Sequence, residues 1–380
     1  MAAPAAGKHV CRTLCLFAAL LCVLMGASEA GQGRLSTLAA LDREEPEFTP
    51  EYEDELEQVA LFIDRSDMEA VSTQIDLMRA LPDYTQILVL VESDDDVEFL
   101  RRNLPLEVYS RVRSVQPEEA DYRVWARDYC AGYGRIKLLP WWCVYGGKVD
   151  MARGVRTFLR RTGSELRRIP VLFDGGNVLL ARDNSGENVL LAGADTYFRT
   201  ADFFASLNVR LSERGFTEIA KGAFGVDRVV VLDADDGGGA AQQQFPLLHL
   251  DQIMLPVADG LLAMECMECS SGAGTSELGA ALAAYRNAVE EAGFSVIELP
   301  TDEEHVANTQ SYVNAIVYTD RTSGQRCVIM PIFPCENGQY RMEGLNLANM
   351  QAFEAAGLAV TVVRDALHHQ GGSLHCISLR

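Results

Sequence analysis

The chain of 380 residues is 48% hydrophobic and 23% charged, with 31 glycines and 13 prolines. These proportions are ordinary for a globular protein and exclude a collagen, a coiled coil or a largely disordered chain. The 33 basic and 54 acidic residues give a formal charge of -21, so no broad surface would neutralise nucleic-acid phosphates. We therefore expect no nucleic-acid partner, whereas the acidic field would attract a cationic substrate.

The first thirty residues have the order of charge and hydropathy that is typical of a secretory signal peptide. Lys8 and Arg12 precede an apolar run over residues 14–27, and Ser28-Glu29-Ala30 supplies small residues for cleavage. The run is shorter than the roughly 20 residues that a membrane-spanning helix needs. We expect residues 1–30 to be removed, the protein to be secreted or extracytoplasmic, and no stable membrane insertion afterwards. An uncleaved anchor is the alternative.

The cysteines are consistent with that compartment. Three of the ten lie in the expected signal peptide, which leaves an odd number in the mature chain. In an oxidising compartment at least one thiol then stays unpaired or pairs with another chain. The single CxxC pair, Cys266 and Cys269, favours a local disulfide or two packed thiols, because one such pair does not make a zinc site.

Residues 31–80 form a separate zone, which we predict to be an acidic N-terminal arm or linker. Between Asp42 and Glu57 there are nine acidic residues and one arginine, interrupted by two prolines. High charge with few apolar residues favours a flexible, solvated segment. The alternative is an arm that docks on a basic face, and the arginine-rich helix expected over residues 150–162 offers one.

From residue 83 onward, short apolar strands alternate with amphipathic helices. Strands are expected over 86–92, 171–180, 187–191, 228–233, 249–256, 260–264, 295–299, 313–318, 325–332 and 358–363. Helices are expected over 94–102, 150–162, 197–207, 276–293 and 345–356. Turn-forming residues between neighbouring strands, such as Asp183-Asn184-Ser185-Gly186, predict hairpins.

These elements recur in the order strand, hairpin, strand, helix, strand. Such repetition predicts one α/β body of repeated ββαβ units arranged in a ring, rather than two unrelated domains. A doubly wound sheet is the competing α/β architecture, but the hairpins are too frequent for an all-parallel sheet.

Several short segments place reactive side chains beside glycines or strand ends. They hold Trp125 and Asp128, then Asp174 and Asn177 around a glycine pair, then His249 and Asp251, and finally Cys376 after Gly371-Gly372. Residues two apart on a strand share a face, so His249 and Asp251 would point the same way. Two glycines before a cysteine allow a close backbone approach, which suits a nucleophile. Each segment is weak alone, because a buried cysteine usually serves packing.

Together, one thiol, one imidazole and three carboxylates suit a guanidinium substrate. Paired carboxylates bind a guanidinium through charge-assisted hydrogen bonds. A thiolate can attack its central carbon, and a histidine can move the protons. Carboxylates would not help a cysteine protease to bind a neutral amide.

These motifs resemble the signature set of the guanidino-group-modifying (pentein) superfamily. The matching segments are Trp125-Ala126-Arg127-Asp128, Asp174-Gly175-Gly176-Asn177, His249-Leu250-Asp251, Tyr312-Val313-Asn314 and the Gly-Gly-Ser-Leu-His-Cys segment at 371–376. The pattern is most similar to the family that joins agmatine deiminases and Porphyromonas-type peptidylarginine deiminases. The resemblance implies a pentein catalytic domain over residues 81–380, folded as a five-bladed α/β propeller.

The resemblance also implies residue roles. Cys376 would be the nucleophile and His249 the general acid and base, and Asp128 and Asp251 would hold the guanidinium nitrogens. Asp174 would lie beside the catalytic histidine, at a position where the family usually has Glu. Substrate binding would also involve Trp125, Asn177 and Asn314. The implied reaction yields a ureido product and ammonia through a covalent thiouronium, and it needs no metal or other cofactor.

The substrate and the activity leave alternatives open. Expected secretion favours peptidyl-arginine, because agmatine chemistry is usually intracellular. An agmatine deiminase, an amidinotransferase and a non-catalytic cation-binding propeller are the alternatives. The chain also departs from the family pattern after Asp128, where Cys130-Ala131 replaces the usual Gly-Pro.

Overall fold

The computed structural model describes residues 49–116, 122–133, 136–140, 151–232, 249–267, 276–335 and 338–380. The expected signal peptide lies outside these residues, as do Cys143 and Cys269. None of the cysteines within the described ranges is in a disulfide; these are Cys130, Cys266, Cys327, Cys335 and Cys376.

The described strands form five three-stranded sheets, each built from strands that are consecutive in the chain. The first contains β1 (Gln58–Phe62), β2 (Gln86–Leu90) and β3 (Val112–Val115), and the second contains β4 (Ala131–Tyr133), β5 (Ile136–Pro140) and β6 (Glu165–Ile169). The third contains β7 (Val178–Arg182), β8 (Asn188–Gly193) and β9 (Arg228–Leu232). The fourth contains β10 (Met254–Ala258), β11 (Leu261–Cys266) and β12 (Ser295–Pro300), and the fifth contains β13 (Ile316–Thr319), β14 (Arg326–Ile332) and β15 (Ala359–Arg364).

Four of the five units share one topology, and the first unit differs. In the later sheets the first two strands pair antiparallel and the last two pair parallel. In the first sheet all three strands are parallel. The reason is α3 (Met68–Ala80), a helix that lies between β1 and β2 where the other units have a hairpin turn. A parallel pair requires such a crossover.

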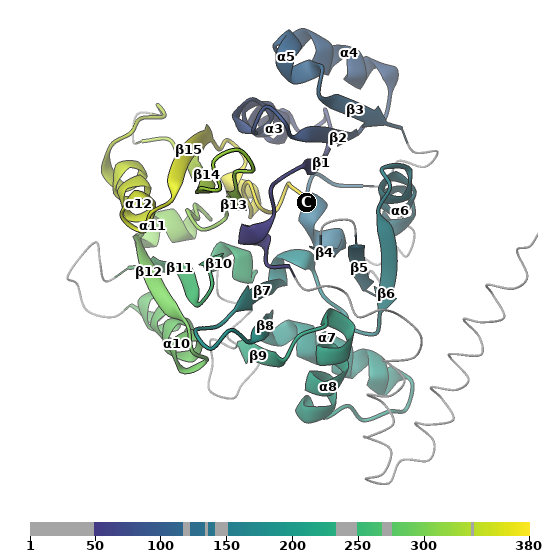
Figure 1. The fold of residues 1–380 in the computed structure, drawn as a ribbon, viewed down its shortest axis with the longest axis vertical. Coiled ribbons are helices and arrows are strands. Elements are labelled where there is room, and N and C mark those ends of the chain that lie inside the picture. Colours follow the sequence, from purple (N-terminus) through teal and green to yellow (C-terminus); the bar gives the residue numbers. More distant parts are fainter. Residues whose placement is uncertain are drawn as a thin grey trace, which may run out of the picture.

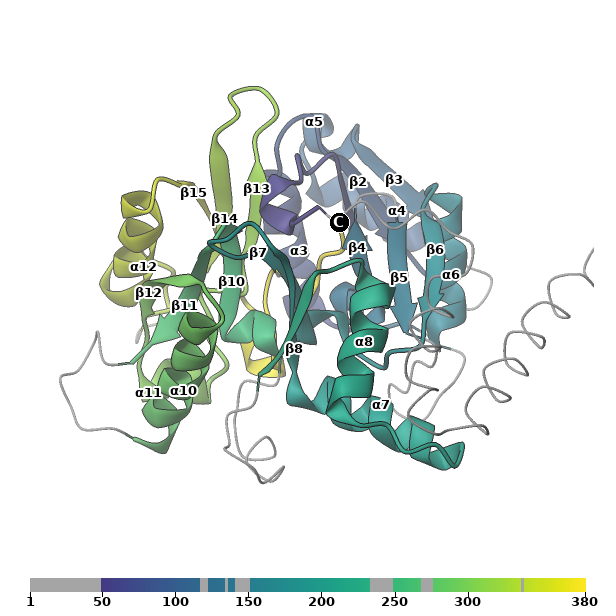
Figure 2. The same ribbon diagram turned by 60° about the horizontal axis from the view of Figure 1, so that its bottom comes forward.

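The remaining helices connect strands and lie toward the periphery of the molecule, while the sheets follow one another around its middle (Figures 1 and 2). They are α4 (Asp94–Asn103), α5 (Leu106–Tyr109), α6 (Met151–Arg161), α7 (Ala194–Ser206), α8 (Glu213–Phe224), α10 (Glu277–Glu291), α11 (Glu303–Ala307) and α12 (Gly344–Ala355). Nowhere in the described ranges is a helix long and apolar enough to cross a membrane.

Hydrophobic clusters between the sheets and the helices hold the units together. One cluster joins Phe204 of α7 and Phe216 of α8 to Leu138 of β5 in the neighbouring unit, and all three side chains are buried. Burying a side chain of this size contributes about 1.5–3 kcal/mol to folding. Strands such as β7 and β8 are buried at nearly every position, so they appear in the sequence as continuous apolar runs.

Most predicted strands and helices are present, but two predicted strands begin later. The strand predicted over residues 171–180 starts only at Val178 as β7, because Gly175–Asn177 form a 3-10 turn. The strand predicted over residues 249–256 also begins later. Residues Leu250–Gln252 form a 3-10 turn, η6, and β10 starts only at Met254. The Gln252 side chain accepts a hydrogen bond from the His249 N–H at 3.3 Å, and the Gln252 N–H donates to the His249 carbonyl. This local bonding replaces ladder pairing at the start of the predicted strand.

The predicted acidic arm over residues 31–80 is also corrected, because its second half belongs to the folded body. A 3-10 turn, η2 (Glu51–Glu53), precedes β1 and α3, and Tyr52 and Leu56 are completely buried. The acidic side chains of η2 pair with arginines from distant segments rather than remaining solvated. Glu51 contacts Arg127 and Arg380, and Glu53 contacts Arg182.

Candidate active site

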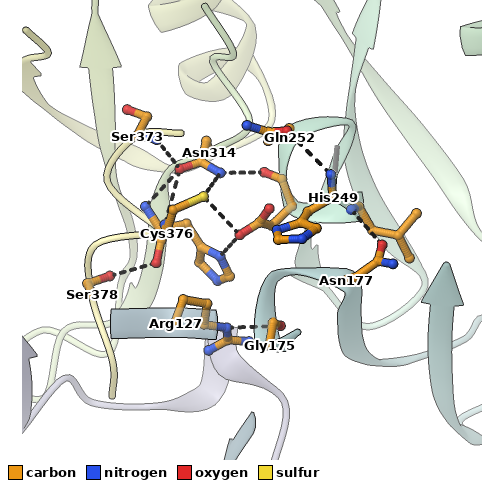
Figure 3. A network of polar contacts seen from close by, with 12 residues as sticks. Arg127, Gly175, Asn177, His249, Gln252, Asn314, Ser373, Cys376 and Ser378 are labelled. Carbon is orange, nitrogen blue, oxygen red and sulfur yellow. Dashed lines mark hydrogen bonds and ion pairs between the residues drawn. The ribbon is translucent and has the colours of Figure 1, made fainter. Parts of the chain in front are cut away.

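Short segments from four successive units meet near the middle of the molecule, each just before the first strand of its sheet. They are η3 (Ala126–Tyr129) before β4, η4 (Gly175–Asn177) before β7, η6 before β10, and Asn314 before β13. The segment 371–380 follows β15, and its Leu379 pairs with Ala60 of β1. Because the units repeat, residues far apart in the sequence reach one place (Figure 3).

The Cys376 thiol is buried between an amide and a carboxylate. The sulfur lies 3.1 Å from Asn314 Nδ2 and 3.5 Å from Asp251 Oδ2 (Figure 3). Burial raises the pKa of Cys376 well above its usual value, and the negative charges of Asp251 and Asp128 raise it further. Without substrate, the group is therefore a thiol at neutral pH.

His249 lies between two carboxylates. Its Nδ1 is 3.7 Å from Asp128 Oδ1, and its Nε2 is 3.5 Å from Asp174 Oδ2. Burial by itself lowers the pKa of His249, but the hydrogen bond with Asp174 and the charges of Asp128 and Asp251 outweigh burial and raise the pKa to about 9. The imidazole is thus protonated at neutral pH and can act as an acid.

Asp174 is held in its ionised form by two cationic partners. Arg199 Nη1 lies 2.5 Å from Asp174 Oδ2, the same oxygen that faces His249. Burial raises the pKa of Asp174, but His249 and Arg199 outweigh burial, so the pKa lies below its usual value. The same arginine reaches Asp195 at 3.0 Å, which fixes it beside the site.

Asp251 is completely buried, and its two carboxylate oxygens have different surroundings. Oδ2 lies 2.7 Å from His375 Nδ1 and faces the Cys376 sulfur. Oδ1 has no hydrogen-bond partner among the described residues. A buried carboxylate oxygen without a partner is costly unless a ligand supplies the donor.

The two predicted asparagines hold backbone in place. Asn314 Oδ1 accepts hydrogen bonds from the N–H groups of Ser373, His375 and Cys376, at 3.0, 3.1 and 3.3 Å. Asn177 Oδ1 accepts one from the N–H of Leu250 at 3.2 Å. Asn314 therefore orients the segment that carries the thiol, and Asn177 orients the turn next to His249.

Glycines allow the close approach of these segments. A Cβ on Gly372 would lie 2.6 Å from the Trp125 ring and 3.0 Å from the Cys376 sulfur. A Cβ on Gly176 would lie 2.8 Å from Asp251 Oδ2 and 2.9 Å from His249 Nδ1. Trp125 thus packs against the backbone beside the thiol, and the sequence correctly indicated a close approach at Gly372.

The structure brings together all eight residues singled out from the sequence and adds three that were not assigned a role. These are Glu51, Arg127 and His375. Arg127 and His375 lie inside the motifs described above, next to Asp128 and Cys376. Only this position in the sequence could have indicated that they belong to the site. Glu51 stands in the acidic stretch that was predicted to be an arm.

His, Cys, Asp and Glu side chains form no group of three or more that could hold a metal ion, as far as the described ranges extend.

Comparisons with known proteins agree with this geometry. The family model for Porphyromonas-type peptidyl-arginine deiminase matches residues 60–380. The chain belongs to that family. It is accordingly a hydrolase that acts on C–N bonds of linear amidines and modifies a guanidino group. A search of curated proteins finds no match.

Solved structures share the fold of this family member at low sequence identity. The agmatine deiminase of C. jejuni is 17% identical with a TM-score of 0.60, and the alignment covers 87% of this chain and 94% of that one. A C. jejuni variant with substrate bound gives the same values. The agmatine deiminase of Enterococcus faecalis is 16% identical with a TM-score of 0.59, covering 87% and 94%. The α/β fold is therefore that of the agmatine deiminases.

The family match includes every predicted site residue but begins after η2. Glu51 therefore contributes to the site from outside the matched region.

Proposed function

We propose that the protein is a deiminase in which Cys376 attacks the guanidinium carbon of peptidyl-arginine. The observation that carries this proposal is the assembly of Cys376, His249, Asp128 and Asp251 in one buried place. A thiol, an imidazolium and paired carboxylates are the groups that covalent hydrolysis of a guanidinium needs.

The two carboxylates are suited to hold the substrate cation. Asp251 Oδ1 is buried and without a partner in the described part of the chain, so it can accept a guanidinium N–H. Asp128 lies on the Nδ1 side of His249 and can accept a second N–H. Hydrogen bonds between a guanidinium and carboxylates are about twice as strong as neutral ones.

Substrate binding would also activate the thiol. Burial is the largest cause of the raised pKa of Cys376, and the negative charges of Asp251 and Asp128 raise it further. A guanidinium between these carboxylates offsets their charge, so the pKa of the thiol falls. The Asn314 amide, 3.1 Å from the sulfur, stabilises the thiolate that forms.

The reaction then follows in two halves. The Cys376 thiolate forms a C–S bond to the guanidinium carbon and gives a tetrahedral adduct. His249 protonates one nitrogen, the C–N bond breaks, and ammonia leaves a thiouronium on Cys376. Neutral His249 next takes a proton from water as the oxygen adds to the same carbon. The C–S bond breaks, the thiolate departs, and the hydroxyl of the adduct loses its proton, which the released ammonia takes up, to leave the C=O of the ureido product. In sum, guanidinium and water give a ureido group and ammonium.

The choice of peptidyl-arginine rests on two supports. The matching family model is described by that substrate. We further propose that the protein is exported, because residues 1–30 have the pattern of a signal peptide. Agmatine is the second candidate, favoured by the fold shared with agmatine deiminases.

One assay distinguishes these functions. The protein is incubated with an arginine peptide, with free arginine and with agmatine, and ammonia and ureido product are measured. We expect product from the peptide and none from Cys376→Ala, with Cys327→Ala as the active control. Product from agmatine alone would contradict the peptidyl assignment. Transfer to an added amine without hydrolysis would indicate an amidinotransferase, and no product from any substrate would indicate a cation-binding protein.

We also propose that the five sheets are the blades of a five-bladed α/β propeller. The consecutive three-stranded sheets and the similar topology of four of them support this arrangement.

A further inference from the structure

The imidazole of His375 is enclosed between two carboxylates that do not belong to its own segment. Its Nδ1 lies 2.7 Å from Asp251 Oδ2, and its Nε2 lies 2.9 Å from Glu51 Oε2. The side chain is 1% exposed, and the Asp251 side chain is fully buried. No water can therefore replace either contact without opening the site.

This geometry places a carboxylate oxygen at each ring nitrogen. An ionised carboxylate can only accept hydrogen bonds, so each ring nitrogen must donate one. A histidine that donates from both nitrogens is an imidazolium, and its hydrogen bonds are charge-assisted. A neutral ring would turn a lone pair toward one of the two carboxylates at less than 3 Å.

Glu51 is anchored from the other side by two arginines. Arg127 pairs with Oε1, and Arg380 Nη2 lies 2.6 Å from Oε2. Burial raises the pKa of Glu51, but Arg127, Arg380 and His375 outweigh burial and hold the pKa well below its usual value. Glu51 therefore stays ionised and fixes the far end of the imidazole.

The same contacts reach the reacting groups. Arg127 precedes Asp128, and its backbone N–H donates to the Cys376 carbonyl at 3.0 Å. The imidazole engages only Oδ2 of Asp251, which leaves Oδ1 without a partner among the described residues. The carboxylate is thus held with one oxygen directed away from the histidine.

We propose that Glu51 and His375 are positioning residues that orient Asp251 for the substrate guanidinium. A chain of hydrogen bonds runs from Glu51 of η2 through the ring of His375 to Asp251, so a segment outside the family match completes the active site. The proposal rests on the proposed function for its kinetic consequence, whereas the state of His375 can be measured without turnover.

The kinetic experiment compares Glu51→Gln with Glu53→Gln in the full chain. Both residues lie on η2, but Glu53 pairs with Arg182 and does not contact His375. Loss of a group that orients a site residue lowers activity by about 10- to 100-fold. We expect that loss in kcat/KM, with part of it in KM, for Glu51→Gln, and less than a twofold change for Glu53→Gln. Unchanged kinetics in Glu51→Gln would overturn the proposal.

The spectroscopic experiment uses full-length protein with ¹⁵N-labelled histidine at neutral pH. We expect both ring nitrogens of His375 to carry protons, with the signals assigned by their absence in His375→Asn. Glu51→Gln should shift the Nε2–H signal, which faces Glu51, and Glu53→Gln should leave both signals in place. A wild-type His375 with one unprotonated ring nitrogen would overturn the proposal, even if Glu51→Gln does not fold. If the spectrum is as expected and no guanidine is turned over, the proposed function fails and the chain of hydrogen bonds stands.

Discussion

At the scale of single residues, the site is a set of opposed charges in a buried place. Asp174 shows how the neighbouring charges hold one of these groups in place. Its Oδ2 still reaches His249 Nε2 at 3.5 Å, and Arg199 fixes the same oxygen at 2.5 Å. The arginine thus holds the carboxylate oxygen that faces the imidazole.

The pH dependence of catalysis follows from the pKa of His249. Once a bound guanidinium has lowered the pKa of the Cys376 thiol, kcat should fall at high pH as His249, whose pKa is about 9, loses its proton. Asp174→Asn removes the hydrogen bond and charge that raise the pKa of His249, so burial lowers it. We expect the falling limb of kcat against pH to move to lower pH by about one unit. Glu298→Gln, which removes a charge that pairs with Arg286 of α10, should leave the limb in place. An unmoved limb in Asp174→Asn would mean that Asp174 does not set this pKa.

At the scale of elements, the side chains of the candidate site lie on short turns rather than on strands. The turn η4 passes so close to η6 that a Cβ on Gly176 would lie within 3 Å of both Asp251 and His249. The two turns are also tied by the bond from Leu250 N–H to Asn177. The two turns can therefore lie this close only because Gly176 has no side chain.

This close approach makes Gly176→Ala a test of turn spacing. The added methyl group must push Asp251 and His249 apart, and a displacement of about 1 Å can cost 100-fold in rate. We expect kcat/KM to fall by about that factor, measured as ammonia release. Gly279→Ala in α10 is the matched control, since its Cβ would meet only Ser276 Oγ at 3.6 Å. Alanine in a helix should slightly stabilise that variant. Equal activity in the two variants would show that the turns tolerate the shift.

The sequence predicted the regular strands and helices correctly but not these turns. Apolar periodicity predicted strands such as β8 and helices such as α10, because their burial is regular. The same periodicity wrongly extended β10 back over His249. The hydrogen bond that the Gln252 side chain accepts there has no periodic pattern in the sequence. Asp251 was correctly placed near His249, but through a turn rather than a shared strand face.

At the scale of the whole molecule, η2 links units that are far apart in the sequence. Tyr52 is fully buried, and its hydroxyl donates to Asp259 between β10 and β11 at 2.6 Å. Its carbonyl accepts from Thr319 of β13, 267 residues away. Glu51 meets His375 over 324 residues. Composition could predict only a solvated stretch there, because nothing local distinguishes these residues from the acidic residues around them.

Substitution of Tyr52 tests whether this segment holds the units together. Tyr52→Ala removes a large buried ring and should lower the free energy of unfolding by about 3–5 kcal/mol. Tyr52→Phe keeps the ring and loses the hydroxyl's bonds with Asp259 and with the Arg182 N–H, so the loss should be about 0.5–1.5 kcal/mol for each bond. Denaturant unfolding measures both values, with exposed Phe198→Ala as the control that should change little. If Tyr52→Ala lowered the free energy of unfolding no more than Phe198→Ala does, η2 would not hold the units together. The units would then be stabilised by their own hydrophobic clusters. Because Glu51 is the neighbouring residue, Tyr52→Ala should also lose activity, whereas Tyr52→Phe should keep it.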